Sequence, residues 1–556
     1  MSYDPSDKQR AVINATAPVI VVLGGAGSGK TTTAAATAAK RLADDDARRA
    51  ALQRSTPIGS APTITPTGRI MFLSFSRTSV SQILDRAASV LGTHQSRIEV
   101  VTFHGFAWRV LRDFGRHYGV PHPLRVRSAA EMQLGIDLSG LTYDELIPEA
   151  LRVLRIPAVA AIYERRYLAV ICDEFQDTSD VEWEFMQAIS PSSQRLLLGD
   201  VNQCIYAGMK KIDPSARVNE ALTLTSAKEI RLAAQSYRDP SGVLPAAALA
   251  ALGRQFSDPA IAEAVRGERL KVHRASGDAA VDSLALEVVK GERAQGKSVS
   301  IFTHTNVATA DLSTRLAVSG IDHEQVGFAE AYGEGLQAQF QLLRWALIRK
   351  PGGRQALAIY LRSILRGKAA ANAQCHAIIE KSNPEFEASL RGVIADLQSA
   401  AQPSPDVDAI LSVLRSMHDR LGFPRGRETW ILANRQLKRA SRCLQVGNGF
   451  DSLTAEVARL RAEELVGIAT GRSKPVQVMN LHQTKGREAD ATVLVLQNDE
   501  YHGSEKTEPF AVGSRLLYVC MTRARERAHI IVPDNVHPLW RPLINACIGV
   551  ANDAST

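Results

Sequence analysis

The stretch from Val19 to Thr33 constrains the fold more than any other part of the chain. It begins with a short apolar run, continues through a glycine-rich turn and ends in small residues and strong helix formers. The turn carries the pattern G-x-x-x-x-G-K-[ST], with its fixed positions at Gly24, Gly29, Lys30 and Thr31. A strand, a glycine loop and a helix in this order predict a phosphate-binding loop in a parallel α/β sheet.

Each residue type in this loop suits a bound phosphate chain. Glycines let successive backbone N–H groups point at phosphate oxygens, and the helix that opens at Lys30 adds the positive end of its dipole. We expect Lys30 to reach the β- and γ-phosphates and the Thr31 hydroxyl to hold Mg²⁺. A glycine-rich turn with a chance lysine is the simpler interpretation, but it leaves the flanking strand and helix unexplained.

Length and composition describe an ordinary globular protein. The 556 residues predict about three or four domains, and 45% are hydrophobic while 22% are charged. The net charge, 66 − 58 = +8, is compatible with a nucleic-acid partner without requiring one. The six cysteines form no C-x-x-C pair, which argues against a zinc or iron–sulfur site and favours a reducing, cytoplasmic setting. No signal peptide and no membrane span are expected.

A second apolar run delivers two carboxylates. The segment Tyr167 to Asp177 reads Y-L-A-V-I-C-D-E-F-Q-D, so Asp173 and Glu174 fall at the carboxyl end of a buried strand. Ligands bind at that edge of open α/β sheets. In a phosphate-loop protein we expect Asp173 to bind Mg²⁺ through water and Glu174 to orient the attacking water. A solvated acidic loop would not explain two carboxylates directly after an apolar run.

Other segments end in polar residues that suit a nucleotide. Gln9 lies on a helix predicted to start at Ser6 or Asp7, and its carboxamide suits an adenine edge, although most glutamines on helices are solvated. Further along come strands predicted at 298–303, 477–481, 491–497 and 528–532, and a helix over 514–525. The stretch 51–68, rich in Pro, Ser, Thr and Gly, predicts a surface loop. The remaining polar candidates are Asp200, Gln203, Tyr237, Arg238 and Arg523.

Two further strands end in hydroxyl, aromatic and basic residues. One leads into Ser76 and Arg77, and the other runs through Thr102 into His104. Such residues suit a single-stranded nucleic acid, because hydroxyls and arginine bind phosphate while rings stack on bases. Taken alone, the residues favour the alternative of a core strand end followed by an amphipathic helix.

In this order the segments resemble the superfamily 1 DNA helicases of the UvrD/Rep/PcrA type. The motifs that carry the resemblance span nearly the whole chain, namely Gln9, G-G-A-G-S-G-K-T, F-S-R-T, T-F-H-G-F, D-E-F-Q-D, G-D-V-N-Q-C-I-Y, S-Y-R, H-Q-T-K-G-R-E and L-L-Y-V-C-M-T-R-A. The resemblance implies an α/β fold of two RecA-like P-loop domains, with parallel sheets flanked by helices, ATP between them and a mostly helical inserted subdomain. It also reverses the preference at Ser76 and His104 in favour of nucleic acid.

The resemblance assigns roles position by position. ATP and Mg²⁺ would be held by Gln9, Gly24, Gly25, Ala26, Gly27, Ser28, Gly29, Lys30, Thr31, Thr32, Asp173, Tyr237 and Glu488. Catalysis would rest on Lys30, Glu174, the γ-phosphate sensor Gln203 and the arginine fingers Arg238 and Arg523. Single-stranded DNA would be lined by Ser76, Arg77, Thr102, His104, Tyr206, His482 and Thr484.

The resemblance also implies a domain division. The first RecA-like domain would span 1–228, with a short insertion at about 113–163; the second would combine 229–332 with 472–556, and a helical insertion would fill 333–471. Three departures stand out. Thr32 replaces an arginine that stacks on adenine, Gly208 stands where an aromatic usually stacks a base, and Arg487 and Ala489 replace a leucine and a phenylalanine.

Two functions remain open from the sequence. The first is an ATP-dependent translocase or helicase, moving 3′ to 5′ and contacting single-stranded DNA and single-strand/duplex junctions. The second is a DNA-stimulated ATPase subunit that senses DNA and regulates a separate nuclease or defence effector with little unwinding of its own. The two arginine segments and Gln203 exclude a phosphate-loop kinase or GTPase.

Overall fold

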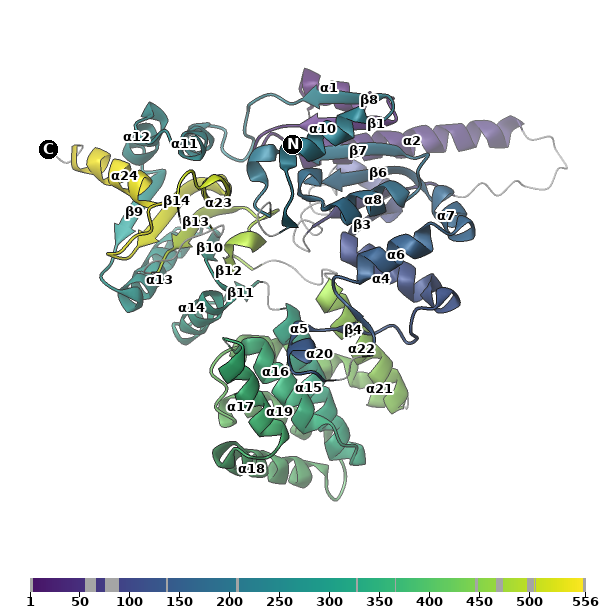
Figure 1. Cartoon of the computed structure of the whole chain (residues 1–556), viewed down its shortest axis with the longest axis vertical. Helices are drawn as coiled ribbons and strands as arrows, with labels where there is room; N and C mark the ends of the chain where they lie inside the picture. The colour runs from purple at the N-terminus through teal and green to yellow at the C-terminus, as the bar shows by residue number, and fades with distance from the viewer. Residues whose placement is uncertain are drawn as a thin grey trace. The chain divides into compact units, whose positions relative to one another are not determined.

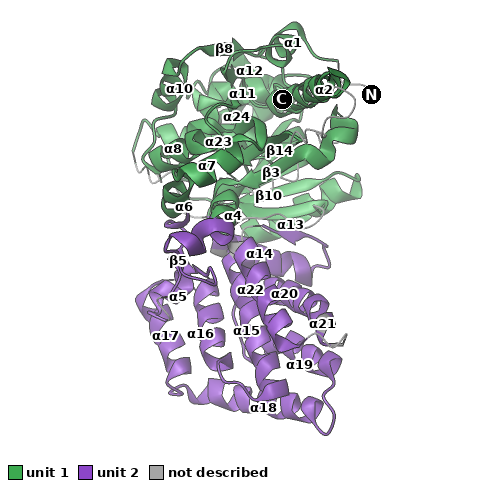
Figure 2. Ribbon diagram, turned by 90° about the vertical axis from the view of Figure 1, so that its right-hand side faces the viewer, with its two compact units in different colours: residues 1–110, 147–304, 469–556 green, residues 111–146, 305–468 purple. Residues whose placement is uncertain are grey.

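A computed structural model describes residues 4–55, 67–75, 90–136, 139–206, 210–326, 329–365, 367–445, 449–466, 474–497, 505 and 507–553. The chain divides into two compact units (Figure 2). Unit 1 contains Met1–Val110, Ile147–His304 and Ala469–Thr556, and unit 2 contains Leu111–Leu146 and Thr305–Ile468. Both units are therefore assembled from separated stretches of sequence. The domain bounds expected from the sequence stay a prediction.

The first sheet of unit 1 is parallel and has the order β3-β2-β6-β7-β1-β8 (Figure 1). All five residues of β1 are buried, as expected for a strand covered on both faces. Helix α2 packs on β2, β6 and β7, and α10 packs on β1 and β8. The strands are β1 Val19–Leu23, β2 Arg69–Ser74, β3 Ile98–Thr102, β6 Tyr167–Asp173, β7 Gln194–Gly199 and β8 Ala227–Arg231.

The helices around this sheet begin with strong local caps. Ser6 caps α1 and Ser179 caps α8, each in a reciprocal hydrogen-bonded box with the third helical residue. Helix α2 starts at Lys30 and runs to Ser55, so the first residues of the loop expected at 51–68 are helical. The helices are α1 Asp7–Ile13, α2 Lys30–Ser55, α4 Phe103–Phe114, α6 Leu146–Leu154, α7 Pro157–Glu164, α8 Asp180–Ala188 and α10 Pro214–Thr223.

A second parallel sheet in unit 1 contains strands in the order β12-β10-β13-β14-β9. Helix α13 packs on β10, β13 and β14, and α23 packs on β13 and β14. Its elements are β9 Leu270–Arg274, β10 Val299–Thr303, β12 Val476–Asn480, β13 Ala489–Val495, β14 Ala524–Val532, α11 Val243–Leu252, α12 Pro259–Arg266, α13 Asp278–Ala294, α23 Ala511–Met521 and α24 Arg541–Asp553. Two helix-flanked parallel sheets confirm the predicted α/β fold with two RecA-like domains.

Unit 2 is mostly helical and has its own core. Trp430 and Tyr360 are wholly buried there, and the Trp430 indole donates to the Leu414 carbonyl over 2.8 Å. Ala130 and Leu134, from the earlier stretch of sequence, belong to the same apolar cluster. The elements are β4 Val126–Arg127, α5 Ala129–Gln133, β5 Leu141–Thr142, α14 Asn306–Val318, β11 Glu324–Gln325, α15 Ala329–Ile348, α16 Gly353–Ile364, α17 Ala369–Ile379, α18 Pro384–Ala401, α19 Val407–Arg420, α20 Arg427–Ala440, α21 Arg442–Gln445 and α22 Phe450–Val466. None of the described helices is long and apolar enough to cross a membrane.

A buried charge cluster joins the two stretches of unit 2. The Arg461 guanidinium on α22 donates to Glu131 on α5 over 2.7 Å and to Glu334 on α15 over 2.6 Å. The same group reaches the Val126 carbonyl at 3.1 Å. Burial raises the pKa of Glu334, while the positive charge of Arg461 opposes that rise. Arg461 therefore compensates the buried carboxylate of Glu334 and shares that of Glu131 with Arg125.

We expect Arg461→Met to lower the free energy of unfolding by about 3–5 kcal/mol, because it removes one partner from a buried ion cluster. Thermal and urea denaturation of purified protein measure this change. Arg459→Met is the matched control, because Arg459 pairs with Glu456 and Glu463 on the same helix at the surface, with 44% of its side chain exposed. The control should lose less than about 1 kcal/mol. Equal losses in the two variants would contradict a special role for the buried cluster.

Candidate active site

The glycine-rich loop between β1 and α2 is held by three neighbouring segments. Gly24 N–H donates to the Gly199 carbonyl over 3.2 Å, and Ala26 N–H donates to the Tyr518 hydroxyl over 3.3 Å. The loop carbonyl of Gly27 accepts from Tyr237 N–H at 2.8 Å. Gly27 itself has a φ of 75°, and a Cβ there would lie 2.3 Å from a serine hydroxyl, so only glycine fits. The loop is thus fixed in a conformation that leaves its inner face to a ligand.

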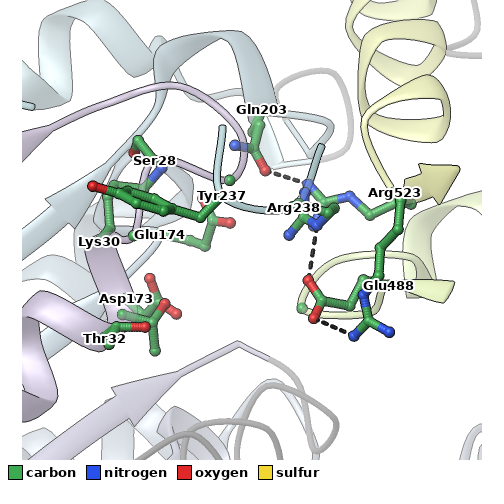
Figure 3. A pocket seen from close by; sticks show the side chains of 15 residues that line it. Ser28, Lys30, Thr32, Asp173, Glu174, Gln203, Tyr237, Arg238, Glu488 and Arg523 are labelled. Carbon is green, nitrogen blue, oxygen red and sulfur yellow. Dashed lines mark hydrogen bonds and ion pairs between the residues drawn. The ribbon is translucent and has the colours of Figure 1, made fainter. Parts of the chain in front are cut away.

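Lys30 is the first residue of α2 and its side chain folds back over this loop. Its ammonium donates to the carbonyls of Gly24 at 2.6 Å and Gly25 at 3.1 Å. Figure 3 shows Lys30, Asp173 and Glu174 together on one side of the pocket, with Arg523 and Glu488 on the other. The predicted phosphate lysine and both predicted carboxylates therefore line one cavity.

The acidic pair follows β6, as the sequence predicts. Asp173 ends the strand and is buried, and Glu174 has a left-handed φ of 58°, which is uncommon for a residue with a side chain. The Glu174 carboxylate accepts from the Gln176 amide over 2.7 Å and lies 3.9 Å from the Lys485 ammonium. Burial alone would raise the pKa of Glu174, but Lys485 and Lys30 outweigh it and hold that pKa below its ordinary value. Glu174 is therefore an anion fixed in a strained turn.

Gln203 and Arg523 meet across the pocket. Gln203 ends a short 3-10 helix after β7, and its amide nitrogen donates to Asp200 over 2.7 Å. Its carbonyl oxygen accepts a hydrogen bond from the Arg523 guanidinium, which follows α23 in the second domain. The side-chain amide oxygen of Gln176 accepts from Asp200 N–H at 3.2 Å. A continuous hydrogen-bonded path therefore links the Glu174 carboxylate to Arg523.

Arg238 is held by the second domain. Its Nε donates to Glu488 over 2.8 Å and its Nη1 donates to the Thr522 carbonyl over 2.6 Å. The other oxygen of Glu488 accepts from Arg525 at 2.7 Å. Arg525 also lines the pocket, and the sequence interpretation missed it. The R-A-R spacing after the helix was the available indication, because residues two apart on an extended strand share a face.

Gln9 and Tyr237 flank Gly29 at one end of the loop. The Gln9 carbonyl oxygen accepts from Ser6 N–H at 2.9 Å within the cap of α1. A Cβ at Gly29 would lie 2.7 Å from the Gln9 amide nitrogen and 3.4 Å from the Tyr237 ring. Gln9 is buried, whereas Tyr237 is 51% exposed. A buried amide donor and an exposed ring side by side suit the edge and the face of a purine.

The candidate nucleic-acid residues differ from one another in burial and in their hydrogen bonds. Thr102 is buried, and its hydroxyl accepts from Gly105 N–H at 2.9 Å, so it caps α4. Thr484 is wholly buried and its hydroxyl donates to the Leu481 carbonyl over 2.8 Å. Burial, aided by the nearby charge of Lys210, lowers the pKa of His104 to about 3, so its ring is neutral at neutral pH. Ser76, Arg77 and Gly208 lie outside the described residues.

Tyr206 and His482 form a direct contact between the two RecA-like domains. The Tyr206 hydroxyl donates to the His482 carbonyl over 2.6 Å, and the two rings stack with centroids 5.9 Å apart. The Lys485 ammonium lies 5.5 Å from the Tyr206 ring centroid. Lys485 also pairs with the buried carboxylate of Asp177, just after the acidic pair. The predicted DNA-lining residues Tyr206 and His482 are therefore connected to the pocket through Lys485, which the sequence interpretation did not single out.

Comparison with known proteins agrees with this arrangement. A family described as AAA domain matches residues 8–209. The "ATP-dependent DNA helicase UvrD1" of Mycobacterium tuberculosis is 25% identical over 218 residues, which are 35% of this chain and 27% of the relative. "DNA helicase II" of Escherichia coli is 23% identical over 241 residues, 32% of this chain and 33% of the relative. In these matched stretches the chain is similar to the UvrD/Rep-type superfamily 1 helicases.

The similarity extends to one further group. An ATP-dependent helicase/nuclease subunit of Streptococcus thermophilus is 29% identical over 120 residues, which are 21% of this chain and 10% of the relative. The matched regions thus span a third or less of each relative's length.

One departure from the UvrD/Rep-type pattern falls inside the pocket. Thr32 lines it where the family pattern has an arginine, so this part of the pocket has the Tyr237 ring without a guanidinium at that position. Another departure, Ala489, begins β13, and its N–H donates to the Arg523 carbonyl over 3.2 Å. A small side chain stands where the segment with Glu488 approaches the strand that follows Arg523.

The same pocket has the donors that Mg²⁺ requires. Thr31 and Asp173 both line it, one from the start of α2 and one from the end of β6. A hydroxyl and a carboxylate are hard oxygen ligands, and a site of this kind usually completes its shell with water and substrate phosphate. The residues present therefore fit the ion.

Proposed function

We propose that this protein is an ATP-dependent translocase on single-stranded DNA that unwinds duplex DNA with 3′-to-5′ polarity. The observation that carries the proposal is the hydrogen bond between Gln203 and Arg523. It places a cation from the second RecA-like domain in the same pocket as Lys30 and Glu174 from the first. A pocket built by both domains lets hydrolysis change how the two domains contact each other.

The residues divide the chemistry of hydrolysis among them. The loop N–H groups and Lys30 bind the phosphates, and Lys30 exchanges its two loop carbonyls for phosphate oxygens. Glu174 orients a water for attack on the γ-phosphorus and accepts its proton, while the bond between the γ-phosphorus and the bridging oxygen breaks and ADP leaves. Arg238 and Arg523 neutralise charge that develops on the phosphoryl oxygens. Thr31 and Asp173 would hold Mg²⁺, which when bound would supply positive charge to the phosphates.

The contact between Tyr206 and His482 supports coupling to the strand. Tyr206 lies three residues after Gln203, and it touches the second domain through the His482 carbonyl. A change at the γ-phosphate sensor is therefore transmitted over a short backbone distance to residues proposed to line DNA. His104, Tyr206 and His482 offer rings for stacking, and neutral histidines suit bases better than phosphates.

An ATPase assay with and without single-stranded DNA, beside strand displacement on 3′- and 5′-tailed duplexes, tests the proposal. We expect Mg²⁺-dependent hydrolysis that rises with single-stranded DNA, and displacement that requires the 3′ tail. Hydrolysis indifferent to DNA would contradict the translocase, and displacement only from 5′ tails would contradict the polarity.

The similarity to a helicase/nuclease subunit favours a second candidate. In that case the protein is a DNA-stimulated ATPase that acts with a separate nuclease and unwinds little by itself. Strong DNA-stimulated hydrolysis without strand displacement on either tailed duplex would select this function.

We expect the affinity for single-stranded DNA to fall steeply with salt, because phosphate contacts would dominate binding. The measurement is the slope of log affinity against log salt, about −0.7 for each phosphate neutralised on a single strand. His104→Gln should leave the slope unchanged, because its pKa of about 3 keeps the wild-type ring uncharged. A shallow wild-type slope, or a slope reduced by about one phosphate in His104→Gln, would contradict these expectations.

A further inference from the structure

The Glu488 carboxylate is shared by two arginines at the edge of the pocket. Arg238 donates to Oε2 over 2.8 Å, and Arg525 donates to Oε1 over 2.7 Å. Only 15% of the Glu488 side chain is exposed, so its carboxylate needs these cations as compensating partners. Figure 3 shows the contact between Glu488 and Arg238.

Arg525 is anchored independently of Arg238. It lies on β14, and its second contact is with Asp490 at 3.2 Å. Asp490 is in turn fixed to the preceding edge of β10, where it accepts from the Ser298 N–H over 2.9 Å and from the Ser298 hydroxyl over 2.7 Å. Arg525 can therefore keep its hydrogen bond to Glu488 when Arg238 breaks its own.

This arrangement matters when Arg238 moves to phosphate. To act as a finger, Arg238 must exchange its contact with Glu488 for an oxygen of the bound nucleotide. Without a second cation that exchange would leave a largely buried carboxylate uncompensated, which is strongly unfavourable. With Arg525 in place, Glu488 keeps one charged partner throughout.

We propose that Arg525 is a positioning residue for the arginine finger: it holds Glu488 and so releases Arg238 to the terminal phosphate of ATP. The inference rests on the proposed ATPase function. Arg525 itself acts through Glu488 and stays on the second domain. The role concerns the hydrolytic step more than nucleotide binding.

Steady-state ATPase measurements on Arg525→Ala, Arg525→Lys and Glu488→Gln test it. In Arg525→Ala we expect kcat to fall about tenfold with a smaller change in KM for ATP, the lower range for a bond between charged groups at a partly exposed site. Arg525→Lys should recover part of kcat, because an ammonium still compensates one carboxylate oxygen. Arg527→Ala is the matched control, since Arg527 lies two residues along β14 and pairs with Glu292.

A double-mutant cycle tests whether Arg525 changes kcat through Glu488. If Arg525 acts through Glu488, adding Arg525→Ala to Glu488→Gln should cost less than about twofold in kcat. An undiminished loss in that background, a wild-type kcat in Arg525→Ala, or a tenfold loss in Arg527→Ala would each overturn the inference. Wild-type protein without ATPase activity would instead overturn the proposed function on which it rests.

Discussion

Glu174→Gln is expected to abolish ATP turnover while ATP binding persists. The amide has nearly the same shape as the carboxylate, but it cannot accept the proton of the attacking water. Loss of a general base costs about 10²- to 10⁴-fold in rate. Turnover is measured by phosphate release, and binding by equilibrium titration with a fluorescent ATP analogue.

The surrounding contacts make this variant a clean test. Gln176 and Lys485 hold the wild-type carboxylate in place, and an amide oxygen can still accept from Gln176. Glu184→Gln on α8 is the matched control, because Glu184 pairs with Arg155 at the surface and is 53% exposed. Lys30→Ala should also abolish turnover, by losing the phosphate contact. Full activity in either pocket variant would remove these residues from the mechanism.

Arg523→Ala is expected to lose on the order of 10³-fold or more in kcat, with a much smaller change in nucleotide affinity. The reason is that a finger interacts mainly with charge that develops during phosphoryl transfer. Arg523→Lys should not restore the rate, because an ammonium lacks the planar fork that grips two oxygens. Single-turnover hydrolysis together with ATP titration separates the two quantities.

Gln203→Ala tests the hydrogen bond between Gln203 and Arg523 from the Gln203 side. It removes the side-chain amide that accepts from Arg523 Nη2 and keeps the guanidinium itself, whose Nε still donates to the Val519 carbonyl over 3.3 Å. We therefore expect a smaller loss than in Arg523→Ala. If nucleotide affinity collapsed in Arg523→Ala while kcat held, Arg523 would be a binding residue and not a finger.

That the glycine-rich loop and the acidic pair would meet at one site was predictable, because each is local in sequence. The loop at 24–31 and the acidic pair both follow strands that are buried on each face, and such strands read as continuous apolar runs. Parallel strands place their carboxyl ends at the same edge of the sheet. Lys30 and Asp173 therefore line one pocket, although β7 lies between β1 and β6.

Contacts between distant segments were not predictable in the same way. Lys485 carries no pattern that separates it from surface cations, and Arg525 has only its spacing from Arg523. Only the folded chain shows their carboxylate partners. Thr484 matched a motif that lines DNA, yet its hydroxyl satisfies a carbonyl of its own turn. The end of α2 was also missed, because helix formers in 51–55 adjoin a stretch rich in turn residues.

The composite construction of the helical unit limits how this protein can be dissected. Removing 305–468 by a single deletion would leave Ala130 and Leu134 without the core into which they pack, and Glu131 without Arg461. The main chain of α5 would also lose the Asn372 amide that donates to the Gln133 carbonyl over 3.0 Å. A truncated gene would need to omit 111–146 as well, and a separately expressed helical piece would need both stretches joined by a new linker.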